Sequence, residues 1–538
     1  MRIARLSYGG FRPLVCERCW TVRIDLSDLD GRHFDVLVIG GGINGASSAQ
    51  HLAAEGYTVL LVDKGDFAAG STGRSTRMLH CGLRYFETPR PVRDFLFNPA
   101  RFRAALSMAR ASMETRAELA TDSPERLIRF TLCFPIYKDW PYKPWHLDLG
   151  FKILGALGSK TVPLDYRRLP IQEARALPLV NQLANPERLH SVATFREYMM
   201  DWPERFCIDA VLDAQRMGAT VRNYTTARLV RRDDQGLWRV GLTDADATAT
   251  VTANVVLNMA GIWIDTVNRT EEPDAAPGRL ILGTKGAHIA VRLPPEYRKH
   301  GIATVNSLGE PHYCLPSQGG YHHIGPTETV YEGDIDDIRV DRKELEFLLA
   351  ETNAILPGLR LAEADVVYSW AGVRPLTYDP AFPKGSRSRE IHDLSNEGLP
   401  NVLAMTAGPV MSHRSAGREM TAAVKRIIAP SRQPQRPNYK PRQLPEHANA
   451  PPLIEGDESV RLSHLGHVAT TEHCRDLADI LFAHTGLGYR HLLRDAEIRL
   501  AAEAVSTHLG WDAAEVDRQV AATRSRIEAV YRTATDAR

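Results

Sequence analysis

Residues 34–63, FDVLVIGGGINGASSAQHLAAEGYTVLLVD, contain the pattern that decides the fold. The apolar run 34–39 has the composition of a buried parallel strand, and Gly40, Gly42 and Gly45 follow it as G-x-G-x-x-G. A helix rich in small residues and a second short apolar strand complete the stretch. This order of elements predicts a nucleotide-binding βαβ unit.

The glycines and the acid that ends the stretch have separate physical roles. Gly40 permits a tight turn, Gly42 lets the backbone approach a pyrophosphate, and Gly45 lets helix and strand pack closely. The helix N-terminus then points at the phosphates. The carboxylate of Asp63, at the end of the second strand, can accept hydrogen bonds from both ribose hydroxyls, which disfavours a 2′-phosphate.

The sequence that follows, DKGDFAAGSTGRSTRMLHCGLRYFE at 63–87, differs from an ordinary dinucleotide-binding continuation. It is rich in Gly, Ser, Thr and Arg, so it can run extended beside a ligand with many backbone N–H groups free to bind it. This segment favours a flavin over a nicotinamide cofactor. A glycine turn that binds nothing is the alternative, and the strand, helix, strand and acid in register argue against it.

These segments resemble the FAD-dependent glycerol-3-phosphate dehydrogenases, within the wider D-amino-acid oxidase-like flavoprotein superfamily. The family's D-V-I-V-I-G-G-G-I-N-G-A-G is similar to residues 35–47, and its S-S-R-S-S-K-L-I-H-G-G-L-R-Y-L-E is similar to residues 72–87. Further similar motifs follow in the same order: NMAGIWID at 258–265, KGAHIAV at 285–291, HIGPTETVYEGD at 323–334 and WAGVRPL at 370–376. The resemblance covers about residues 33–530.

The resemblance implies an α/β fold with bound FAD. We expect a Rossmann-like FAD-binding domain interleaved with an antiparallel-sheet substrate domain, followed by a C-terminal helical domain. Proline removes backbone donors along a linker, and apolar residues at three- and four-residue spacings predict helices at 474–482, 498–508 and 513–532. The expected boundaries are an N-terminal extension at 1–32, the oxidoreductase domain at 33–428, the linker at 429–453 and the helical domain at 454–538.

The resemblance also implies a set of FAD contacts. Alternating apolar and polar residues at 219–244 predict antiparallel strands that turn at 234–236. In the family, the segment that matches residues 226–229 runs close to the adenine and contacts it through backbone atoms. The expected cofactor-binding residues are Gly40, Gly42, Ile43, Asn44, Gly45, Asp63, Lys64, Thr72, Arg74, Ser75, Leu229, Gly261 and Gly408.

The catalytic residues implied by the resemblance are His80, Arg84 and Arg374. An imidazole titrates near neutrality, so His80 is the candidate base, with a purely structural histidine as the alternative. Arg84 and Arg374 match two substrate-facing arginines, and a guanidinium grips phosphate oxygens in pairs. Structural ion pairs are the alternative. Tyr85 either adds a hydrogen bond to the substrate or packs.

Two departures from the family pattern bear on the substrate. The family's G-G-K-L-T-T-Y-R reads AGPVMSHR at 407–414, so Pro409 replaces a phosphate-site lysine and Met411 replaces a threonine. Cys81 occupies a glycine position beside His80, where it adds a side chain close to the flavin. The candidates for supplying the positive charge of the missing lysine are Arg77, His413 and Arg414.

The expected reaction is oxidation of sn-glycerol 3-phosphate to dihydroxyacetone phosphate by hydride transfer to flavin N5. Because the lysine is missing, another polyol phosphate, a hydroxy acid or an amine is the alternative substrate. A third hypothesis is a fold that binds FAD but has lost catalysis and serves as an interaction module; the presence of His80, Arg84 and Arg374 argues against it.

Composition excludes several other classes of protein. A formal net charge of +1 over 538 residues gives no indication of nucleic-acid binding. The seven cysteines are scattered, which predicts a reducing, cytoplasmic location without structural disulfides. Cys16 and Cys19 form an isolated C-x-x-C, so we expect no metal site. The chain has no apolar run of the ~18 residues that spanning a membrane requires.

Electrons must leave the flavin, to a quinone, to oxygen or to another acceptor. The segment 137–160, YKDWPYKPWHLDLGFKILGALGSK, combines aromatic residues and lysines around an apolar core. Such a segment can lie in a membrane interface, which would place the protein peripherally on the inner face of the cell membrane. It fits a domain-packing element equally well. The sequence leaves open whether the chain forms an oligomer.

Overall fold

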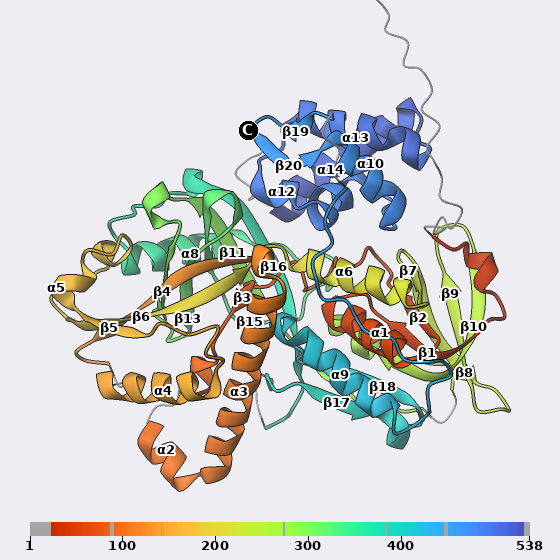
Figure 1. Cartoon of the computed structure of the whole chain (residues 1–538), viewed down its shortest axis with the longest axis horizontal. Helices are drawn as coiled ribbons and strands as arrows, with labels where there is room; N and C mark the ends of the chain where they lie inside the picture. The colour runs from red at the N-terminus through yellow and green to blue at the C-terminus, as the bar shows by residue number, and fades with distance from the viewer. Residues whose placement is uncertain are drawn as a thin grey trace, which may run out of the picture.

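The computed structural model describes residues 23–86, 91–140, 143–272, 275–381, 385–445 and 450–531. Cys16 and Cys19 lie outside the described residues, as do most of the predicted N-terminal extension and the last residue of the predicted helix 513–532. Figure 1 shows two sheets side by side with a helical domain, drawn in blue, packed against both. The expected α/β architecture with a C-terminal helical domain is confirmed.

The βαβ unit forms as predicted. β1 (His33–Ile39), α1 (Ile43–Glu55) and β2 (Val59–Val62) follow each other, and β1 pairs in parallel with β2. The sheet has the order β17-β18-β10-β1-β2-β7, and its parallel core is closed at one edge by an antiparallel strand. The remaining strands of this path are β7 (Thr220–Arg222), β10 (Thr248–Asn258), β17 (Glu390–Asp393) and β18 (Val402–Thr406).

The predicted antiparallel strands form a hairpin that pairs with β10. β8 (Thr226–Arg232) and β9 (Trp238–Thr243) are antiparallel to each other, and β9 is antiparallel to β10. The short helix η1 (Leu26–Leu29) packs its two leucines into the core between this hairpin and the sheet. The end of the predicted extension is therefore part of the domain core.

Three helices cover one face of the nucleotide-binding sheet (Figure 1). They are α1, α6 (Pro203–Arg216) and α9 (His413–Val424), and α1 packs against both of the others. Because α1 consists largely of Gly, Ala and Ser, it lies close to the sheet and is buried along nearly its whole length. This close packing holds the glycine turn in place.

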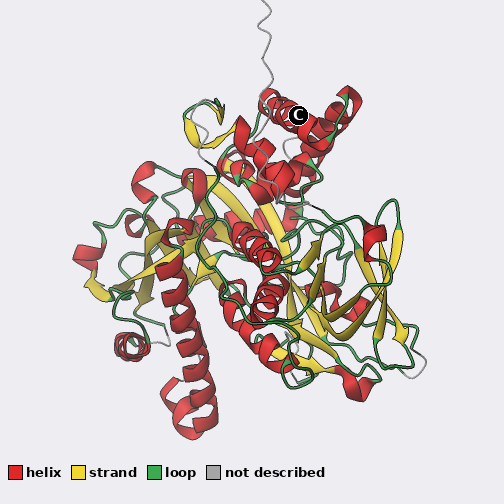
Figure 2. Ribbon diagram, turned by 45° about the vertical axis from the view of Figure 1, so that its right-hand side comes forward, coloured by secondary structure: helices red, strands yellow, loops and turns green. Residues whose placement is uncertain are grey.

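The second sheet forms the substrate domain and is largely antiparallel, in the order β15-β11-β14-β13-β12-β4-β6-β3. β16 pairs with β11, β5 pairs with β6, and helix α8 (Arg342–Ile355) packs against β11. Figure 2 shows this sheet as a separate layer. Its strands are β3 (Met78–Leu79), β4 (Leu127–Tyr137), β5 (Arg167–Pro170), β6 (Leu189–Met200), β11 (Ile281–Arg292), β12 (His300–Val305), β13 (Pro311–Pro316), β14 (Tyr321–Gly325), β15 (Thr329–Val330) and β16 (Val366–Thr377).

Three helices lie at one edge of the substrate domain: α2 (Pro91–Phe97), the long α3 (Pro99–Asp122) and α4 (Pro144–Leu157). In α4, the side chains of Leu147, Phe151 and Leu154 are buried, as a domain-packing element requires, whereas Trp145 and Leu149 are about half exposed. Among the described residues, none of the helices combines the length and the apolar character that crossing a bilayer requires.

The C-terminal domain contains the predicted helices and a small hairpin. The predicted helix 474–482 begins later, at Leu477, and ends as a π-helix, η11 (Ile480–His484). The linker residues 429–445 run along α1, where the N–H groups of Arg432 and Gln435 donate to carbonyls at its C-terminal end. The other elements are β19 (Pro452–Ile454), β20 (Asp457–Arg461), α10 (Leu462–Thr471), α11 (Leu477–Asp479), α12 (Leu487–Arg490), α13 (Asp495–Leu509), α14 (Ala513–Arg526) and η12 (Ile527–Tyr531).

Short helical turns connect these elements. They are η2 (Leu83–Phe86), η3 (Pro124–Arg126), α5 (Ile171–Ala174), η4 (Val180–Gln182), η5 (Gly261–Trp263), α7 (Ile264–Val267), η6 (Pro295–Tyr297), η7 (Gln318–Gly320), η8 (Glu363–Asp365), η9 (Leu394–Glu397) and η10 (Val410–Ser412). Two of them, η5 and η10, follow β10 and β18 directly and contribute residues to the cavity described next.

Candidate active site

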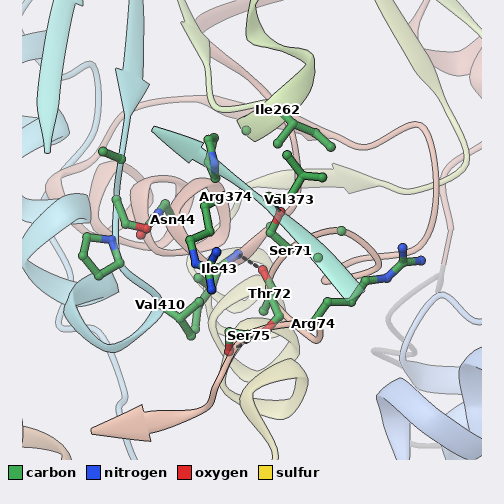
Figure 3. Close-up of a pocket in the computed structure, with 18 of the residues that line it drawn as sticks. Ile43, Asn44, Ser71, Thr72, Arg74, Ser75, Ile262, Val373, Arg374 and Val410 are labelled. Atoms are coloured by element: carbon green, nitrogen blue, oxygen red, sulfur yellow. Dashed lines mark hydrogen bonds between the residues drawn. The ribbon is translucent and has the colours of Figure 1, made fainter. Parts of the chain in front are cut away.

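A cavity of about 600 Å³ lies where the parallel strands of the nucleotide-binding sheet end. Ile39 at the end of β1, Asp63 after β2, Met259 after β10 and Ala407 after β18 all line it. Ligands of open α/β sheets bind outside the carboxyl ends of the strands. Residues of β16 line the same cavity, so it extends from the first sheet onto the second (Figure 3).

The glycine turn leaves room that only glycine provides. Gly40 has φ +109°, and a Cβ there would lie 2.6 Å from the carbonyl oxygen of Met259. A Cβ on Gly45 would lie 1.9 Å from the carbonyl oxygen of Gly40. Gly42 is the N-cap of α1 and brings no side chain over the first turn of the helix. The turn therefore fits the pyrophosphate of the expected FAD.

Asp63 lines the cavity and is held by the backbone. Its Oδ2 accepts a hydrogen bond from the Gly41 N–H at 2.6 Å, and its Oδ1 accepts one from the Gly65 N–H at 2.8 Å. Burial raises the pKa of Asp63 to about 6, although both hydrogen bonds act to lower it. The neighbouring Lys64 forms an ion pair with Asp336 at 2.5 Å. The carboxylate is thus oriented before a ribose arrives.

The segment after Asp63 runs beside the cavity, as its composition predicts. Thr72 Oγ1 accepts a hydrogen bond from the N–H of Ile43 at 3.1 Å, and Ser71 Oγ donates to the carbonyl of Val373 on β16 at 2.8 Å. Figure 3 shows these contacts around the cavity. At Gly372, a Cβ would lie 2.8 Å from the carbonyl oxygen of Arg74, so segment and strand approach closely. The segment therefore connects the two sheets.

Most of the predicted cofactor residues line this cavity. Gly45 and Leu229 do not: Gly45 packs helix against strand, and Leu229 is fully buried in the core below β9. At the β7–β8 connection the lining residues are Thr225, Thr226 and Ala227 instead. The predicted residues that line the cavity are Gly40, Gly42, Ile43, Asn44, Asp63, Lys64, Thr72, Arg74, Ser75, Gly261 and Gly408.

His80 lines the cavity just before η2, together with Tyr85. The two rings meet edge to face with their centres 5.8 Å apart. The Nδ1 atom of His80 is buried and has no hydrogen-bond partner among the described residues. Burial, followed by the charge of Arg84, lowers the pKa of His80 to about 3. The ring is neutral at physiological pH and is able to accept a proton.

Besides Arg74 and Arg77 of the segment after Asp63, three arginines line the cavity: Arg84, Arg374 and one that the sequence did not indicate, Arg387. We call them the arginine group. Arg374 lies on β16, where it pairs with Thr284 of β11, and a Cβ on the nearby Gly286 would come within 2.3 Å of its guanidinium. Its Nη1 atom is buried without a partner in the described part of the chain. Burial and the charge of Arg387 lower the pKa of Arg374 to about 10.

Arg387, which pairs with the lining residue Glu328, adds a guanidinium to the cavity wall, whereas the residues considered as compensating cations have partners elsewhere. Arg414 forms an ion pair with Asp122 at 2.6 Å and does not line the cavity, and neither does His413. Arg77 lines the cavity, but its guanidinium pairs with Glu204 at 3.4 Å. These three candidates are therefore not free cations of the site.

The structure also places the residues at which the chain departs from the family pattern. Pro409 and Met411 line the cavity, so the missing lysine does change its wall. Cys81 does not line it. The thiol is 1% exposed, and the N–H of Cys81 donates to Glu197 at 2.7 Å. The expected side chain beside the flavin is therefore directed into the substrate domain.

Sequence reasoning missed other residues of the cavity wall. His288 lies within the quoted KGAHIAV motif, but that motif was used only as a family match. Its Nε2 lies 3.0 Å from Thr76 Oγ1, and its ring stacks on Trp370 with the ring centres 5.1 Å apart. Burial and the charge of Arg374 lower its pKa to about 3. Further lining residues without a prior prediction are Glu310, Tyr313 and Glu328.

The described residues contain no group of three or more His, Cys, Asp or Glu side chains that could hold a metal ion. Five cysteines in these ranges are free and buried: Cys81, Cys133, Cys207, Cys314 and Cys474.

Comparison with known proteins gives a consistent set of relatives. A family model described as FAD dependent oxidoreductase (DAO) matches residues 35–423. A glycerol-3-phosphate dehydrogenase of Synechocystis sp. is 30% identical over 412 residues, covering 74% of this chain and 71% of that protein. The D-erythritol 1-phosphate dehydrogenase of Brucella abortus is 28% identical over 413 residues, covering 73% and 74%. The crystal structure of a glycerol-3-phosphate dehydrogenase from Bacillus halodurans complexed with FAD has a TM-score of 0.70 at 20% identity, covering 94% and 96%.

Proposed function

The chain belongs to the family of FAD-dependent oxidoreductases, and on that premise we propose that it oxidises sn-glycerol 3-phosphate to dihydroxyacetone phosphate. The observation that carries this proposal is the arginine group. Arg374 has a buried guanidinium nitrogen without a partner among the described residues, and Arg387 pairs with Glu328. Such a group favours a dianionic phosphate.

The side chains have separate tasks in this proposal. FAD, when bound, accepts the hydride at N5. Arg374 and Arg387 hold the phosphate, while Arg84 and Tyr85 orient the rest of the substrate. His80 takes the hydroxyl proton of the carbon that is oxidised. Fixing these groups in one cavity converts the reaction into an effectively intramolecular step.

Substrate binding also changes the basicity of His80. In the empty cavity the positive charge of Arg84 contributes to the low pKa of this imidazole. A bound phosphate dianion offsets that charge and so raises the pKa toward the range in which a base works best. The phosphate thus acts against the smaller of the two causes that lower this pKa, while burial, the larger cause, remains.

His288 is the second candidate for the base. It lines the same cavity, and its pKa is lowered in the same way. We favour His80 because the Nε2 of His288 already contacts Thr76 and the His288 ring stacks on Trp370. The variants His80→Asn and His288→Asn separate the two. The base is the histidine whose replacement slows flavin reduction by about a hundredfold or more. If His288→Asn slows reduction more than His80→Asn does, His288 is the base.

The experiment that tests the substrate is anaerobic mixing of the FAD-loaded protein with candidate substrates while flavin absorbance is followed. We expect rapid bleaching by glycerol 3-phosphate and a much slower reaction with glycerol, which has no phosphate for the arginine group. Bleaching by hydroxy acids or amines alone would overturn the proposal. Tight FAD binding without bleaching by any of these compounds would indicate an interaction module.

D-Erythritol 1-phosphate is the alternative substrate that a specific observation favours. The Brucella abortus relative is named for it, and Pro409 and Met411 replace longer or polar family residues in the cavity wall. The same bleaching experiment decides between the two polyol phosphates. A higher kcat/KM for erythritol 1-phosphate would reassign the substrate and leave the reaction type unchanged.

We further propose a quinone as electron acceptor, reached from the membrane surface. Leu96 and Phe97 of α2 are 70% and 79% exposed, and Trp145 and Leu149 of α4 are also exposed. Figure 1 shows α2 and α4 on the same side of the molecule as the free end of α3. Arg101 and Arg103 of α3 are exposed near α2. Apolar and basic side chains together favour an anionic membrane surface.

Sedimentation with anionic liposomes tests this contact. Leu96→Asp with Phe97→Asp should reduce the bound fraction severalfold. Leu308→Asp is the matched control, because Leu308 is 68% exposed on the turn between β12 and β13. Phe151 and Leu154 are unsuitable targets, because both are buried in the core. Equal sedimentation of both variants would remove the membrane contact from the proposal.

A further inference from the structure

The interface between the C-terminal domain and the nucleotide-binding domain contains a buried histidine between two carboxylates. His484 ends the π-helix η11 and is 0% exposed. Its Nε2 lies 2.9 Å from Asp66 Oδ2, and its Nδ1 lies 2.9 Å from Glu472 Oε2. A neutral imidazole donates from one nitrogen only, whereas an imidazolium donates from both. Two carboxylates, one at each ring nitrogen, therefore favour a charged His484.

The charges around His484 form a compensated chain. Glu472 also receives two hydrogen bonds from Arg205 of α6, at 2.7 and 2.8 Å, and Arg205 pairs in turn with Asp209 at 2.8 Å. Burial acts to lower the pKa of His484, but the neighbouring acidic groups, Cys474 and Asp66 foremost, hold it well above its ordinary value. A buried charge that loses one such partner is strongly destabilised.

Asp66 connects this series of paired charges to the cofactor cavity. It follows Asp63 in the segment that lines the cavity, and its Oδ1 accepts a hydrogen bond from Asn223 Nδ2 at 2.8 Å. The N–H of Thr225, a lining residue, donates to the carbonyl of Asp63 at 2.7 Å. The Asp66 carboxylate thus joins three segments: the loop after β2, the β7–β8 connection and η11.

We propose that the C-terminal helical domain takes part in FAD binding, with His484 as a positioning residue that holds, through Asp66, the two loops beside the adenosine half of FAD. His484 itself does not line the cavity. It acts on Asp63 and Thr225 through Asp66 and Asn223. The segment 472–488, which reads as ordinary helix packing, carries this contact.

Titration of the full-length apoprotein with FAD tests the proposal. His484→Gln should raise the dissociation constant of FAD at least tenfold. His491→Gln is the matched control in the same domain, because His491 pairs with Asp457 at 2.7 Å away from Asp66 and should change FAD affinity less than twofold. FAD-saturated His484→Gln should keep its KM for substrate within threefold. An unchanged FAD affinity on folded apoprotein would overturn the proposal.

A second variant covers the case in which His484→Gln does not fold. Asp66→Asn keeps a hydrogen-bonding group of the same size and should by itself raise the FAD dissociation constant about tenfold. Where both variants fold, the double variant should bind FAD no more weakly than either single one, because the same contact is already lost. If Asp66→Asn lowers the Tm of the apoprotein but leaves FAD affinity unchanged, the contact serves domain packing alone and the proposal is wrong.

Discussion

The cofactor side of the cavity consists mainly of backbone, whereas the substrate side consists of long charged side chains. Around the glycine turn, added atoms collide with main-chain oxygens, as at Gly40 and Gly45. In the arginine group, Arg374 and Arg387 come from a strand and from the loop after it. Burial lowers the pKa of both, and a neighbouring guanidinium lowers it further: Arg387 acts on Arg374, and Arg84 acts on Arg387. The first side is damaged by adding atoms and the second by removing them.

The most severe change should be Gly45→Ala. Its Cβ would lie 1.9 Å from the carbonyl oxygen of Gly40, which is backbone and cannot rotate away. We expect a loss of about 3 kcal/mol or more of stability and nearly complete loss of FAD. FAD content and thermal unfolding measure it. Gly155→Ala is the control, because nothing lies within 4 Å of its added Cβ. Normal FAD content in Gly45→Ala would contradict the claim that added atoms damage the cofactor side.

Removing a charge on the substrate side should affect catalysis and leave FAD in place. Arg374→Met removes a buried guanidinium that has no other partner among the described residues, so kcat/KM for glycerol 3-phosphate should fall by about a hundredfold or more. Arg387→Met should cost about tenfold, because Glu328 already offsets its charge. Steady-state kinetics measures both. An equal loss with unphosphorylated glycerol, or loss of FAD, would contradict this assignment.

The two imidazoles should make the apoprotein sensitive to acid. Burial lowers the pKa of both His80 and His288 to about 3, so in the folded state they stay neutral above that pH. The unfolded chain binds these protons below its ordinary pKa of about 6.5, so stability falls as pH decreases from there. Each histidine should contribute a slope of about 1.4 kcal/mol per pH unit.

Denaturant unfolding of the apoprotein between pH 5 and pH 7 measures this slope. In His80→Gln this slope should decrease by about 1.4 kcal/mol per pH unit, the contribution of one proton. His33→Gln, at the exposed start of β1, is the control and should leave the slope unchanged. A slope that His80→Gln does not alter would show that this imidazole is not the buried base we describe.

The smallest effect should come from Cys81→Gly, which restores the family residue. Because Cys81 points away from the cavity and toward Glu197, kcat/KM should change less than about threefold. Loss of the buried thiol should lower stability by about 1 kcal/mol. Kinetics and thermal unfolding measure the two effects. A large gain in activity would show that Cys81 restricts the flavin site after all.

The elements that sequence analysis predicted correctly depend on neighbours in the chain. The βαβ unit, the β8–β9 hairpin and most of the cavity-lining positions proposed for FAD follow from local patterns of glycine and apolar residues. Leu229 was placed among the FAD contacts, but it occupies an inward-facing position of β8 and belongs to the core. The residues of β8 that line the cavity, Thr226 and Ala227, stand three and two positions before Leu229.

What sequence analysis did not predict depends on contacts between distant segments. Arg387 enters the site because Ser386 pairs with Thr377 at the end of β16, and no local pattern indicates that pairing. His484 shows the same limit: the four residues before it are apolar, and its partner Asp66 belongs to another domain. Such contacts become visible only when the fold is known.

The contact between Asp66 and His484 joins residues 418 positions apart. A ribosome that adds about 5–20 residues per second needs roughly 20–80 s to synthesise that interval. During this time the nucleotide-binding strands are already available to pair, but the loop after β2 lacks its partner. With His484 in its proposed role, the cofactor site is completed only after residue 484 has left the ribosome, long after the strands that surround the site have been made.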